Sequence, residues 1–554
     1  MGINVQFFEM ETLIDCQIEL LEIFMQQNYE IIVFSSNNLL EMYKIYWDNM
    51  NSSDMPTQKI IFWNEGGFSP SFLLANSLQK KINGEFYAIF DVTDRQKPFY
   101  QKQKLVDFKK IWFFHDAISK PQKKVDVEFL TSFEEKYNIN LWLLALNERI
   151  FQEYNEFYKF SREEILSILE DECKFFEKIL EIKPKFLITM PTGFHHHDLF
   201  YQMCRAVGVK TLIFNQSVFD TKCYVSEQSH LFDDKRTIEE LEASNMSFDE
   251  LEKYWKKFEI RKQFTKFGES LRKSKTKKIK AGYDFLLSEN TTIKNNYAYY
   301  GHTKLKALTN YFGGVLKKNF RSNYMDKNFL QVIDDSIPFV YFPLQAMPER
   351  TLLISSPFNT NQTEIIKHIS KSLPIGYRLY VKEHPYQASR EWRKTSFYNE
   401  ILSIPNVQFL HHSIKTEDVM KKCSLVITIN GAAGLEAAIH KKPSILFSDF
   451  SYSIIPSVYQ LKSIDDLPTA IRESLRKKVN PNDVAKYLNL LEDISFDFDM
   501  TGFILDSHNY FYHSGNLIDV EIPEEKVKQF MKKYKSSFDV VADEFIKKIN
   551  YFEK

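Results

Sequence analysis

The stretch VKEHPYQ, residues 381–387, places a lysine, a histidine and a proline at the end of an apolar run. The run before it, YRLYV, has the continuous apolar character of a buried strand. Lys382 would supply a positive point charge, His384 would donate a ring N–H, and Pro385 would fix the turn that presents them. These residue types predict a phosphate-binding strand end, with a capped polar corner at the surface as the alternative.

A second chemical signal is the stretch LVITINGAAGLEAAIH, residues 425–440, in which an apolar strand runs into a glycine-containing loop and then a helix. Gly431 and Gly434 would let the backbone approach a ligand, and the first N–H groups of the helix would suit a phosphate. Glu436, in the first helical turn, would accept hydrogen bonds from ribose hydroxyls. A plain strand–turn–helix junction is the alternative for this motif taken alone.

The two motifs lie one strand–helix–strand step apart, so their strand ends should open on the same edge of one sheet. Together they favour a site for a nucleotide monophosphate or diphosphate. The predicted nucleotide-binding residues are Lys382, His384, Pro385, Asn430, Gly431, Ala432, Gly434 and Glu436.

Composition limits the class of protein. The 554 residues include 72 Lys+Arg and 73 Asp+Glu, and this balanced charge argues against a general nucleic-acid binder. The 5 cysteines form no CxxC pair, which argues against a zinc motif or a disulfide framework and favours a reducing cytoplasm. No run approaches the roughly 20 apolar residues that span a bilayer, and the N-terminus lacks the pattern of a signal peptide. We therefore expect a cytoplasmic protein of two or more domains.

The elements that must position these residues form two α/β groups. Continuous apolar strands alternate with helical stretches in each group, which predicts parallel sheets covered on both faces. The strands expected in the first group are 31–36, 59–64, 86–92, 110–116, 140–146, 185–190 and 210–216. The strands expected in the second, smaller sheet are 339–345, 378–385, 407–412, 425–430 and 443–449.

Four segments follow from this pattern. They are an N-terminal α/β domain over 1–230, a helical connector over 231–335, a C-terminal α/β domain over 336–465 and a helical region over 466–554. The predicted fold class is α/β and GT-B-like, with two Rossmann-like parallel-sheet domains facing each other across a cleft. In such folds ligands bind at the carboxyl ends of the strands.

Three quoted stretches, in order and spacing, resemble the capsule polysaccharide biosynthesis protein family. They are YFPLQAMPERTLL, SLPIGYRLYVKEHP and SLVITINGAAGLEAAIHKKPSILFSDFSY, and the similarity is densest over residues 341–452. The family includes bacterial β-Kdo transferases with a GT-B fold and a histidine–proline motif that holds the phosphate of CMP-Kdo. The resemblance implies that His384 and Pro385 are this pair and that 430–436 is the nucleotide loop. Many relatives have Ser-Thr before the glycine where this chain has NGAAG, so this loop lacks a hydroxyl donor.

The resemblance also implies a catalytic base in the facing domain. Transfer of a sugar needs a carboxylate or an imidazole that takes the proton of the acceptor hydroxyl while the nucleotide phosphate departs. Asp220, in the stretch NQSVFD at 215–220, suits this role, and Gln216 would line the cleft. In the second domain, Gln345 and Glu349 are the expected polar contacts of the cleft, and Arg350 would brace their loop.

The stretch PTGFHHHD, residues 191–198, competes for the catalytic role. His195 and His197, with His196 and Asp198, would bind the acceptor or act as the base. A metal site is a second interpretation, although adjacent histidines point in different directions and their spacing gives no ligand set. A helix N-terminus with Asp198 in its first turn is the third.

The resemblance implies an enzyme that moves a sugar from a nucleotide to a surface polysaccharide or a glycolipid, with Kdo from CMP-Kdo as the leading donor and no separate cofactor. A glycerol- or ribitol-phosphate transferase of the teichoic-acid type is one alternative. A non-catalytic partner in polysaccharide assembly or export is another. We also expect peripheral contact with the inner membrane through the basic segments 272–280 and 526–537.

The sequence DFD, residues 497–499, looks like the DxD motif that binds Mn²⁺ or Mg²⁺ in the other major glycosyltransferase fold. It lies beyond the second predicted sheet, far in sequence from both phosphate motifs. A lysine, a histidine and a helix N-terminus can already balance a departing phosphate. We therefore expect a metal-independent enzyme in which Asp497 and Asp499 are structural or solvated.

Overall fold

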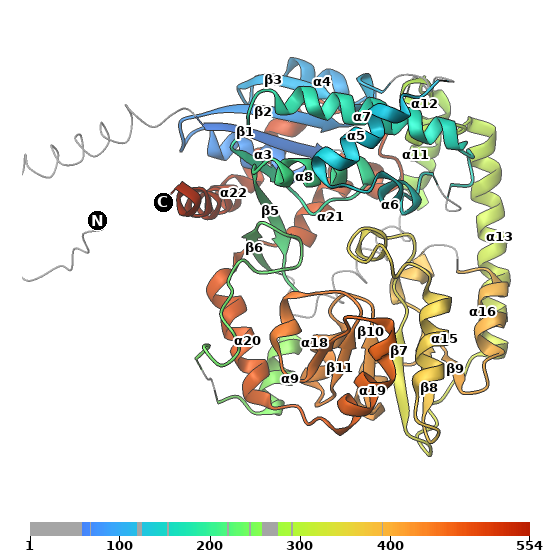
Figure 1. The fold of residues 1–554 in the computed structure, drawn as a ribbon. Helices are drawn as coiled ribbons and strands as arrows, with labels where there is room; N and C mark the ends of the chain where they lie inside the picture. The colour runs from blue at the N-terminus through green and yellow to red at the C-terminus, as the bar shows by residue number, and fades with distance from the viewer. Residues whose placement is uncertain are drawn as a thin grey trace, which may run out of the picture. The chain divides into compact units, whose positions relative to one another are not determined.

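Two separate β-sheets organise the chain (Figure 1). The computed structural model describes residues 58–66, 68–118, 124–151, 155–218, 221–242, 245–257, 275–289, 292–389 and 392–553. The strand predicted at 31–36 lies outside these residues. Within them, both sheets are built mainly from parallel strands with helical crossovers, as the apolar runs predicted.

The first sheet has seven strands in the order β13-β6-β5-β4-β1-β2-β3. The strands β1 to β5 run parallel, β6 pairs antiparallel with β5, and β13 pairs antiparallel with β6. Their bounds are β1 Gln58–Glu65, β2 Gly84–Asp91, β3 Phe108–Phe113, β4 Phe186–Thr189, β5 Lys210–Gln216, β6 Lys222–Ser226 and β13 Phe496–Asp497. Five of the predicted strands are therefore confirmed, and β6 and β13 are additions.

Both faces of the first sheet are buried. Ile60 and Phe62 of β1 point into a core shared with α3 (Pro70–Leu78) and α22 (Glu524–Glu553). Ile61 and Trp63 point the other way, into a core shared with α7 (Arg162–Leu180) and α8 (His195–Ala206). This two-sided burial is the physical reason why the strands read as continuous apolar runs.

The strand predicted at 140–146 is wrong, because these residues form the helix α6 (Leu141–Leu146). The side chain of Asn140 accepts a hydrogen bond from the N–H of Leu143 at 2.8 Å and so caps the helix. The run LWLLAL contains no β-branched residue, and leucine and alanine favour helix. Leu141 and Ala145 are buried, four residues apart on one helical face.

The second sheet has six strands in the order β12-β11-β10-β7-β8-β9, and all its pairings are parallel. Their bounds are β7 Phe339–Pro343, β8 Arg378–Lys382, β9 Val407–Leu410, β10 Leu425–Thr428, β11 Ser444–Leu446 and β12 Val458–Gln460. All five strands predicted here are confirmed. The additional strand β12 has only three residues, too few for a sequence pattern to show.

Both sheets reverse their strand order at one point. The chain goes from β1 outward to β2 and β3, and then β4 pairs on the opposite side of β1. In the second sheet the chain goes from β7 outward to β8 and β9, and then β10 pairs on the opposite side of β7. The crevice at the carboxyl ends of two strands that diverge in this way is where open α/β sheets bind ligands. The fold therefore offers two crevices, one at β1/β4 and one at β7/β10.

In the described residues, helices are the main elements between the two sheets and after the second one. The first group is α9 (Phe248–Lys257), α11 (Lys275–Leu287), α12 (Thr292–Asn295) and α13 (Lys304–Asn328). The second is α19 (Leu467–Arg476), α20 (Pro481–Ile494), α21 (Met500–Phe511) and α22. The chain returns to the first sheet at its end, since β13 pairs with β6 and the α22 residues Phe538 and Phe545 lie in the same core as β1.

Candidate functional site

An amide side chain joins the two strand ends at the crevice of the second sheet. Gln345 follows β7, and its Nε2 donates to Thr428 Oγ1 at 3.2 Å and to the carbonyl oxygen of Asn430 at 3.0 Å. Thr428 is the last residue of β10, and Asn430 begins the predicted nucleotide loop. The structure thus brings together two residues predicted on separate motifs, at the point where parallel sheets bind ligands.

The glycine at the start of this loop is needed for backbone conformation. Gly431 has a φ of 88°, which a residue with a side chain adopts only with strain. A Cβ atom there would meet only Gln345 Oε1, at 3.9 Å, so a lack of space is not the reason why this position is glycine. Asn430 Oδ1 accepts a hydrogen bond from the N–H of Gly431 at 2.6 Å, and the hydroxyl of Tyr452 donates to the Gly431 carbonyl oxygen.

The second glycine of the loop has a different role. A Cβ atom on Gly434 would lie 2.8 Å from Tyr452 Cε2 and 3.1 Å from Leu446 Cδ2. Gly434 therefore serves the close packing of α18 (Ala433–Ile439) on β11, which was the alternative interpretation of this motif. Ala432 is the N-cap residue of α18, and Glu436 is buried in its first turn.

The lysine–histidine corner lies at the end of β8, the strand next to β7. Lys382 is buried, and its Nζ lies 3.4 Å from Thr416 Oγ1 at the start of α17 (Thr416–Lys422). His384 Nδ1 accepts a hydrogen bond from the N–H of Tyr386 at 3.2 Å. This bond places the proton of the neutral ring on Nε2, so the ring is a donor there. Pro385 begins a 3-10 turn, Pro385–Ser389, directly after the histidine.

A buried ion pair that the sequence did not reveal supports this corner. Glu383 Oε1 accepts from Arg393 Nε at 2.8 Å and from the hydroxyl of Tyr398 at 2.9 Å. Arg393 Nη2 also donates to the carbonyl oxygen of Gln345 at 2.6 Å. The pair therefore ties the end of β8 to the residue that joins β7 and β10. Glu383 stands between Lys382 and His384 in the sequence. This position was the feature of the sequence that could have indicated that Glu383 lies at the site.

Arg350 links the loops of the two sheets. Its Nε donates to the carbonyl oxygen of Thr192 at 2.6 Å, and its Nη1 donates to His230 Nε2 at 2.7 Å. Burial and the adjacent Arg350 charge lower the pKa of His230 to about 3, so His230 is neutral and can accept this bond. Burial lowers the pKa of Arg350 to about 10, which leaves it charged at neutral pH. Arg350 thus braces the loop that precedes α8, and Glu349 is the N-cap residue of the short helix α14 (Arg350–Leu353).

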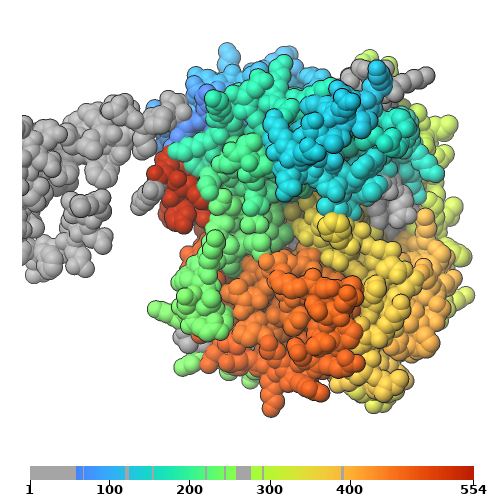
Figure 2. Space-filling view, viewed as in Figure 1, coloured from blue at the N-terminus to red at the C-terminus, as the bar shows by residue number. Residues whose placement is uncertain are grey.

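A cavity of about 240 Å³ brings together residues from both α/β groups. Gln216, at the end of β5, and Ala432, in the nucleotide loop, line it with His230 and Ser451. Ser451 N donates to the His230 carbonyl oxygen at 2.9 Å, so the two sides touch directly. Figure 2 shows the yellow segment after β7 lying against the blue-green segment around α6, where Asn147 Nδ2 donates to the Pro357 carbonyl oxygen at 3.1 Å.

Asp220, the predicted catalytic base, lies outside the described residues. Val218, two positions before it, lines the same cavity as Gln216. Gln216 Nε2 donates to Thr501 Oγ1 at 2.7 Å, which connects the end of β5 to α21. The cavity is smaller than the roughly 300–1,000 Å³ of complete small-molecule sites, so it suits one part of a larger ligand.

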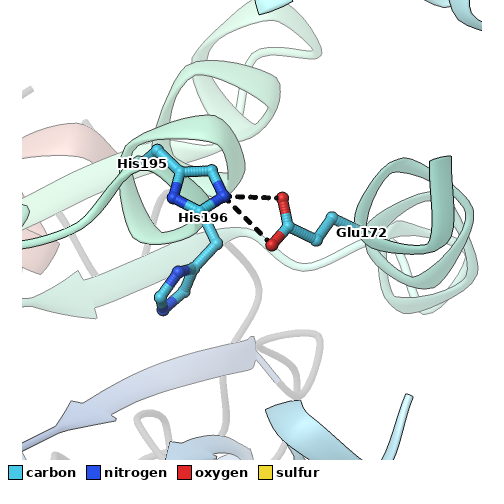
Figure 3. A group of neighbouring side chains, drawn as sticks. All are labelled: Glu172, His195 and His196. Carbon is cyan, nitrogen blue, oxygen red and sulfur yellow. Dashed lines mark hydrogen bonds and ion pairs between the residues drawn. The ribbon is translucent and has the colours of Figure 1, made fainter. Parts of the chain in front are cut away.

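The histidine run at the start of α8 is enclosed by carboxylates. His195 Nδ1 lies 2.9 Å from Glu148 Oε2, and its Nε2 lies 3.1 Å from both carboxylate oxygens of Glu172 (Figure 3). Although burial opposes the charge, Glu172 and Glu148 raise the pKa of His195 to about 10. His195 is therefore an imidazolium at neutral pH with both N–H groups engaged. This state does not suit the proton-accepting role predicted for it.

His196 is held in a different direction by a second carboxylate. Its Nε2 lies 3.0 Å from Asp91 Oδ2, and its Nδ1 lies 3.2 Å from the hydroxyl of Tyr297. Its ring stacks on Phe114 with centroids 4.1 Å apart. Asp91 also lies 2.7 Å from His115 Nε2, and despite burial these two histidines hold the pKa of Asp91 well below its usual range. His196 thus belongs to a network that crosses from α8 to β2.

His197 reaches the crevice of the first sheet. Its Nδ1 lies 2.6 Å from Glu65 Oε2 at the end of β1, and its Nε2 lies 2.7 Å from Thr189 Oγ1 at the end of β4. Glu65 and His197 line a cavity of about 210 Å³ at this crevice. A Cβ atom on Gly193 would lie 2.2 Å from Glu65 Oε1, so any larger residue would displace this carboxylate from its place beside His197. Glu65, His197 and Thr189 at the first crevice are therefore paired with one another.

The third interpretation of the histidine run is confirmed, because α8 begins at His195 with Asp198 in its first turn. Thr192 Oγ1 and Gln202 Nε2 donate to the two Asp198 oxygens at 3.0 and 2.7 Å, and burial raises the pKa of Asp198. Glu172, His195 and His196 place one potential metal-ligand atom each within 4.8 Å of one another. However, the Tyr297 hydroxyl lies 3.0 Å from Glu172 Oε1, and the ring nitrogens already have partners, so hydrogen bonds alone account for this arrangement.

Comparison with solved structures finds matches at low similarity. The UDP-GlcNAc 2-epimerase of Methanocaldococcus jannaschii is 12% identical, with a TM-score of 0.22 and coverage of 79% of this chain and 100% of that chain. The KpsC β-Kdo 2,7 transferase of Thermosulfurimonas dismutans is 12% identical, with a TM-score of 0.25 and coverage of 64% and 97%. The ADP-heptose heptosyltransferase II of E. coli is 9% identical, with a TM-score of 0.20 and coverage of 78% and 99%.

Comparison at the sequence level gives one family. A search of curated protein sequences finds no match. The model of the family described as capsule polysaccharide biosynthesis protein matches residues 268–475, which include the whole second sheet and the motifs at 381–387 and 430–436. The resemblance that these motifs predicted, to the capsule polysaccharide biosynthesis protein family, is confirmed for this part of the chain.

Proposed function

We propose that this protein is a glycosyltransferase that binds a nucleotide sugar at the carboxyl edge of its second sheet. The observation that carries the proposal is the junction of β7 and β10, where Gln345 holds the NGAAG loop at the reversal of strand order. The Nε2 proton of His384 gives the neighbouring strand end a donor for phosphate. The family match covers all these residues.

The donor and acceptor are proposed from the same family match. Kdo from CMP-Kdo is the leading donor, and a surface polysaccharide or glycolipid is the acceptor. The nucleotide phosphate would lie against Lys382, His384 and the N–H groups of 430–434. The cavity lined by Gln216 and Ala432 adjoins this edge and has room for a sugar-sized group.

Asp220 is the proposed base. It follows Val218 by two positions in the sequence, and Val218 lines the cavity together with Gln216, His230 and Ala432 of the nucleotide loop. Its carboxylate would take the proton of the acceptor hydroxyl, whose oxygen forms the new bond to the anomeric carbon. The bond from that carbon to the nucleotide phosphate breaks, and the phosphate leaves with the electron pair. Lys382 and His384 would offset its added charge, so the proposed enzyme needs no metal ion.

Two experiments test the reaction. Transfer is measured with CMP-Kdo and a polysaccharide-derived acceptor, using wild type and Asp220→Asn, with EDTA in parallel. The proposal expects turnover in wild type with or without EDTA, a loss of roughly a hundredfold or more in Asp220→Asn, and unchanged nucleotide affinity in that variant. Transfer of glycerol phosphate from a CDP donor would favour the teichoic-acid alternative instead. Nucleotide binding without transfer from any donor would favour the non-catalytic assembly partner.

The protein is proposed to work in the cytoplasm at the inner face of the membrane. In the described part of the chain, no helix has both the length and the apolar character that a bilayer crossing needs. A lipid-linked acceptor would therefore be met by surface contact.

A further inference from the structure

The helix α13 turns its apolar residues away from the protein. Leu305 is 74% exposed, Leu316 is 71% exposed and Phe320 is 66% exposed. Met325, near its end, is the one buried residue among the described side chains of this 25-residue helix. An apolar stripe on a surface helix normally faces the core, so this orientation needs an explanation.

The exposed residues of α13 form one continuous stripe. Leu305, Leu308, Phe312, Leu316 and Phe320 are spaced by three or four positions, which places them on the same face of a helix, and all five are exposed. Tyr311 and Val315 widen the stripe and are exposed as well. At a rise of 1.5 Å per residue the helix is about 37 Å long. Single apolar residues scattered over a surface need no explanation, but a continuous exposed stripe of this length does.

Basic residues border this stripe. The helix carries Lys304 and Lys306 at its start and Lys317, Lys318 and Arg321 in its second half. No aspartate or glutamate occurs between 304 and 321. Lys317 pairs with Glu156 at 3.0 Å, on a neighbouring loop. Exposed leucine and phenylalanine flanked by lysine, with few acids, is the pattern of helices that lie in a membrane interface.

The neighbouring helix α11 has the same character (Figure 1). Ile279, Tyr283 and Leu287, four positions apart, are all exposed, and Lys277, Lys278 and Lys280 belong to the same helix. Lys304 Nζ donates to the carbonyl oxygens of Leu286 and Ser288 at 2.6 and 2.9 Å, so the end of α11 joins the start of α13. The exposed Leu287 at the end of α11 and the exposed Leu305 at the start of α13 therefore flank this junction.

We propose that the outward apolar stripes of α11 and α13 dock on an anionic lipid bilayer. The leucine, isoleucine and aromatic side chains would enter the boundary of the acyl chains, and the bordering lysines would meet negative headgroups. A second copy of this chain is a poorer occupant, because a symmetric pairing of this surface would bring two basic borders together. The inference uses no residue of the proposed site, so it can fail or succeed independently of sugar transfer.

This surface differs in part from the basic segments expected from the sequence. The segment 272–280 overlaps α11, but the segment 526–537 belongs to α22, where Phe530 is buried in the core of the first sheet. Its Lys528 pairs with Glu524 at 3.0 Å, and its Lys533 pairs with Asp506. Two lysines of this segment therefore have acidic partners, as Lys317 of α13 does, and what distinguishes α13 is its exposed apolar stripe.

The test is sedimentation of the full chain with vesicles of phosphatidylcholine alone or with about 30% phosphatidylserine. We expect binding to the anionic vesicles, and a loss of roughly tenfold or more in the double variant Leu316→Glu/Phe320→Glu. Ile375→Glu is the matched control, because this isoleucine is fully exposed in the loop before β8 and should not affect binding. Equal binding by wild type and the double variant would overturn the proposal.

A second measurement does not depend on the folding of the double variant. Phe312→Trp places a reporter in the stripe, and its fluorescence should shift to shorter wavelength with anionic vesicles and remain unchanged with neutral ones. No shift with anionic vesicles would overturn the proposal. Sedimentation velocity without lipid addresses the other occupant. A dimer that Leu316→Glu/Phe320→Glu dissociates would assign the stripe to a second copy and would also overturn the proposal.

Discussion

The two sheets reverse their strand order in the same way, but their crevices differ in chemistry. At the β1/β4 crevice the titratable groups contact one another, as Glu65 does with His197 at 2.6 Å. At the β7/β10 crevice a neutral amide, Gln345, joins the strand ends, and the cationic corner at Lys382 and His384 lies one strand away. Topology therefore determines where a ligand can bind, and side-chain pairing determines which of the two positions suits an anion.

The energetics of the two crevices differ accordingly. Around α8, carboxylates and histidines are buried together, and removing one partner of a buried ion pair leaves an uncompensated charge. Around the NGAAG loop, the hydrogen bonds of the Gln345 side chain to Thr428 and Asn430 join neutral groups, and each is worth about 1 kcal/mol. We infer that the first crevice stabilises the fold, whereas the second has the chemistry of a phosphate site.

The largest expected effect is on the buried carboxylate–histidine network of α8, the helix that follows β4. His195→Ala leaves Glu148 and Glu172 buried without their shared cation and should lower the free energy of unfolding by about 3–5 kcal/mol. Urea denaturation of wild type and variant gives this difference. His384→Ala is the matched control and should lose less than about 1 kcal/mol, since its ring is half-buried at a turn. Similar losses of unfolding free energy in the two variants would contradict the proposed difference between the two regions.

The same cluster predicts a pH dependence. The pKa of His195 is about 10 in the folded protein, above the ordinary value of 6.5, so the folded state holds a proton that the unfolded state releases. Its stabilising contribution is complete below about pH 6.5 and is lost as the pH rises towards about 10. The difference in unfolding free energy between wild type and His195→Gln should therefore shrink over this range. A difference that stays constant from about pH 6 to about pH 10 would show that His195 is not charged in the fold.

The next effect concerns nucleotide binding at the lysine–histidine corner of the second sheet. Lys382→Ala and His384→Ala should each weaken nucleotide binding by about 1.5–3 kcal/mol, or roughly ten- to a hundredfold in Kd, because each removes a charge-assisted contact to phosphate. Calorimetric titration measures the affinities, and circular dichroism checks that both variants remain folded. Unchanged affinity of both variants for every nucleotide tested would refute the phosphate assignment.

The smallest effect is expected at the DFD motif. Asp499 caps α21 by accepting from the N–H of Gly502 at 2.7 Å, and the exposed Asp497 lies 3.3 Å from Lys222 Nζ. The double variant Asp497→Ala/Asp499→Ala should lose about 1 kcal/mol of stability from the cap and retain transfer in EDTA. Thermal unfolding and the transfer assay test both parts. Loss of transfer in the variant, together with restoration of EDTA-treated wild type by Mn²⁺ or Mg²⁺, would show that the motif binds a catalytic metal.

The main strands of both sheets could be predicted because each is a continuous apolar run buried on two faces. The strand prediction at 140–146 was wrong, because apolar character alone does not distinguish a short strand from a short buried helix. The missed strands β6, β12 and β13 have five, three and two residues. The pairing of β13 with β6 joins segments more than 270 positions apart, which no local pattern reports.

The site was predictable in part for a related reason. Gln345 and Asn430 each follow a predicted strand, and strands of one parallel sheet end at one edge, so their meeting could be expected. The carboxylate partners of the histidine run could not be predicted from the sequence, because Glu65 is 132 positions from His197 and Asp91 is 105 positions from His196. Side-chain pairing across such distances depends on the packed structure.

The most direct test of the contrast is calorimetric titration of CMP, CDP, UDP and GDP into wild type, His384→Ala and Ser507→Ala. Ser507 lines the cavity at the first crevice and serves as its reporter. We predict that at least one nucleotide binds wild type, that His384→Ala weakens this binding roughly tenfold or more, and that Ser507→Ala leaves it unchanged. Binding that Ser507→Ala weakens and His384→Ala does not would place the nucleotide at the first sheet and contradict the account.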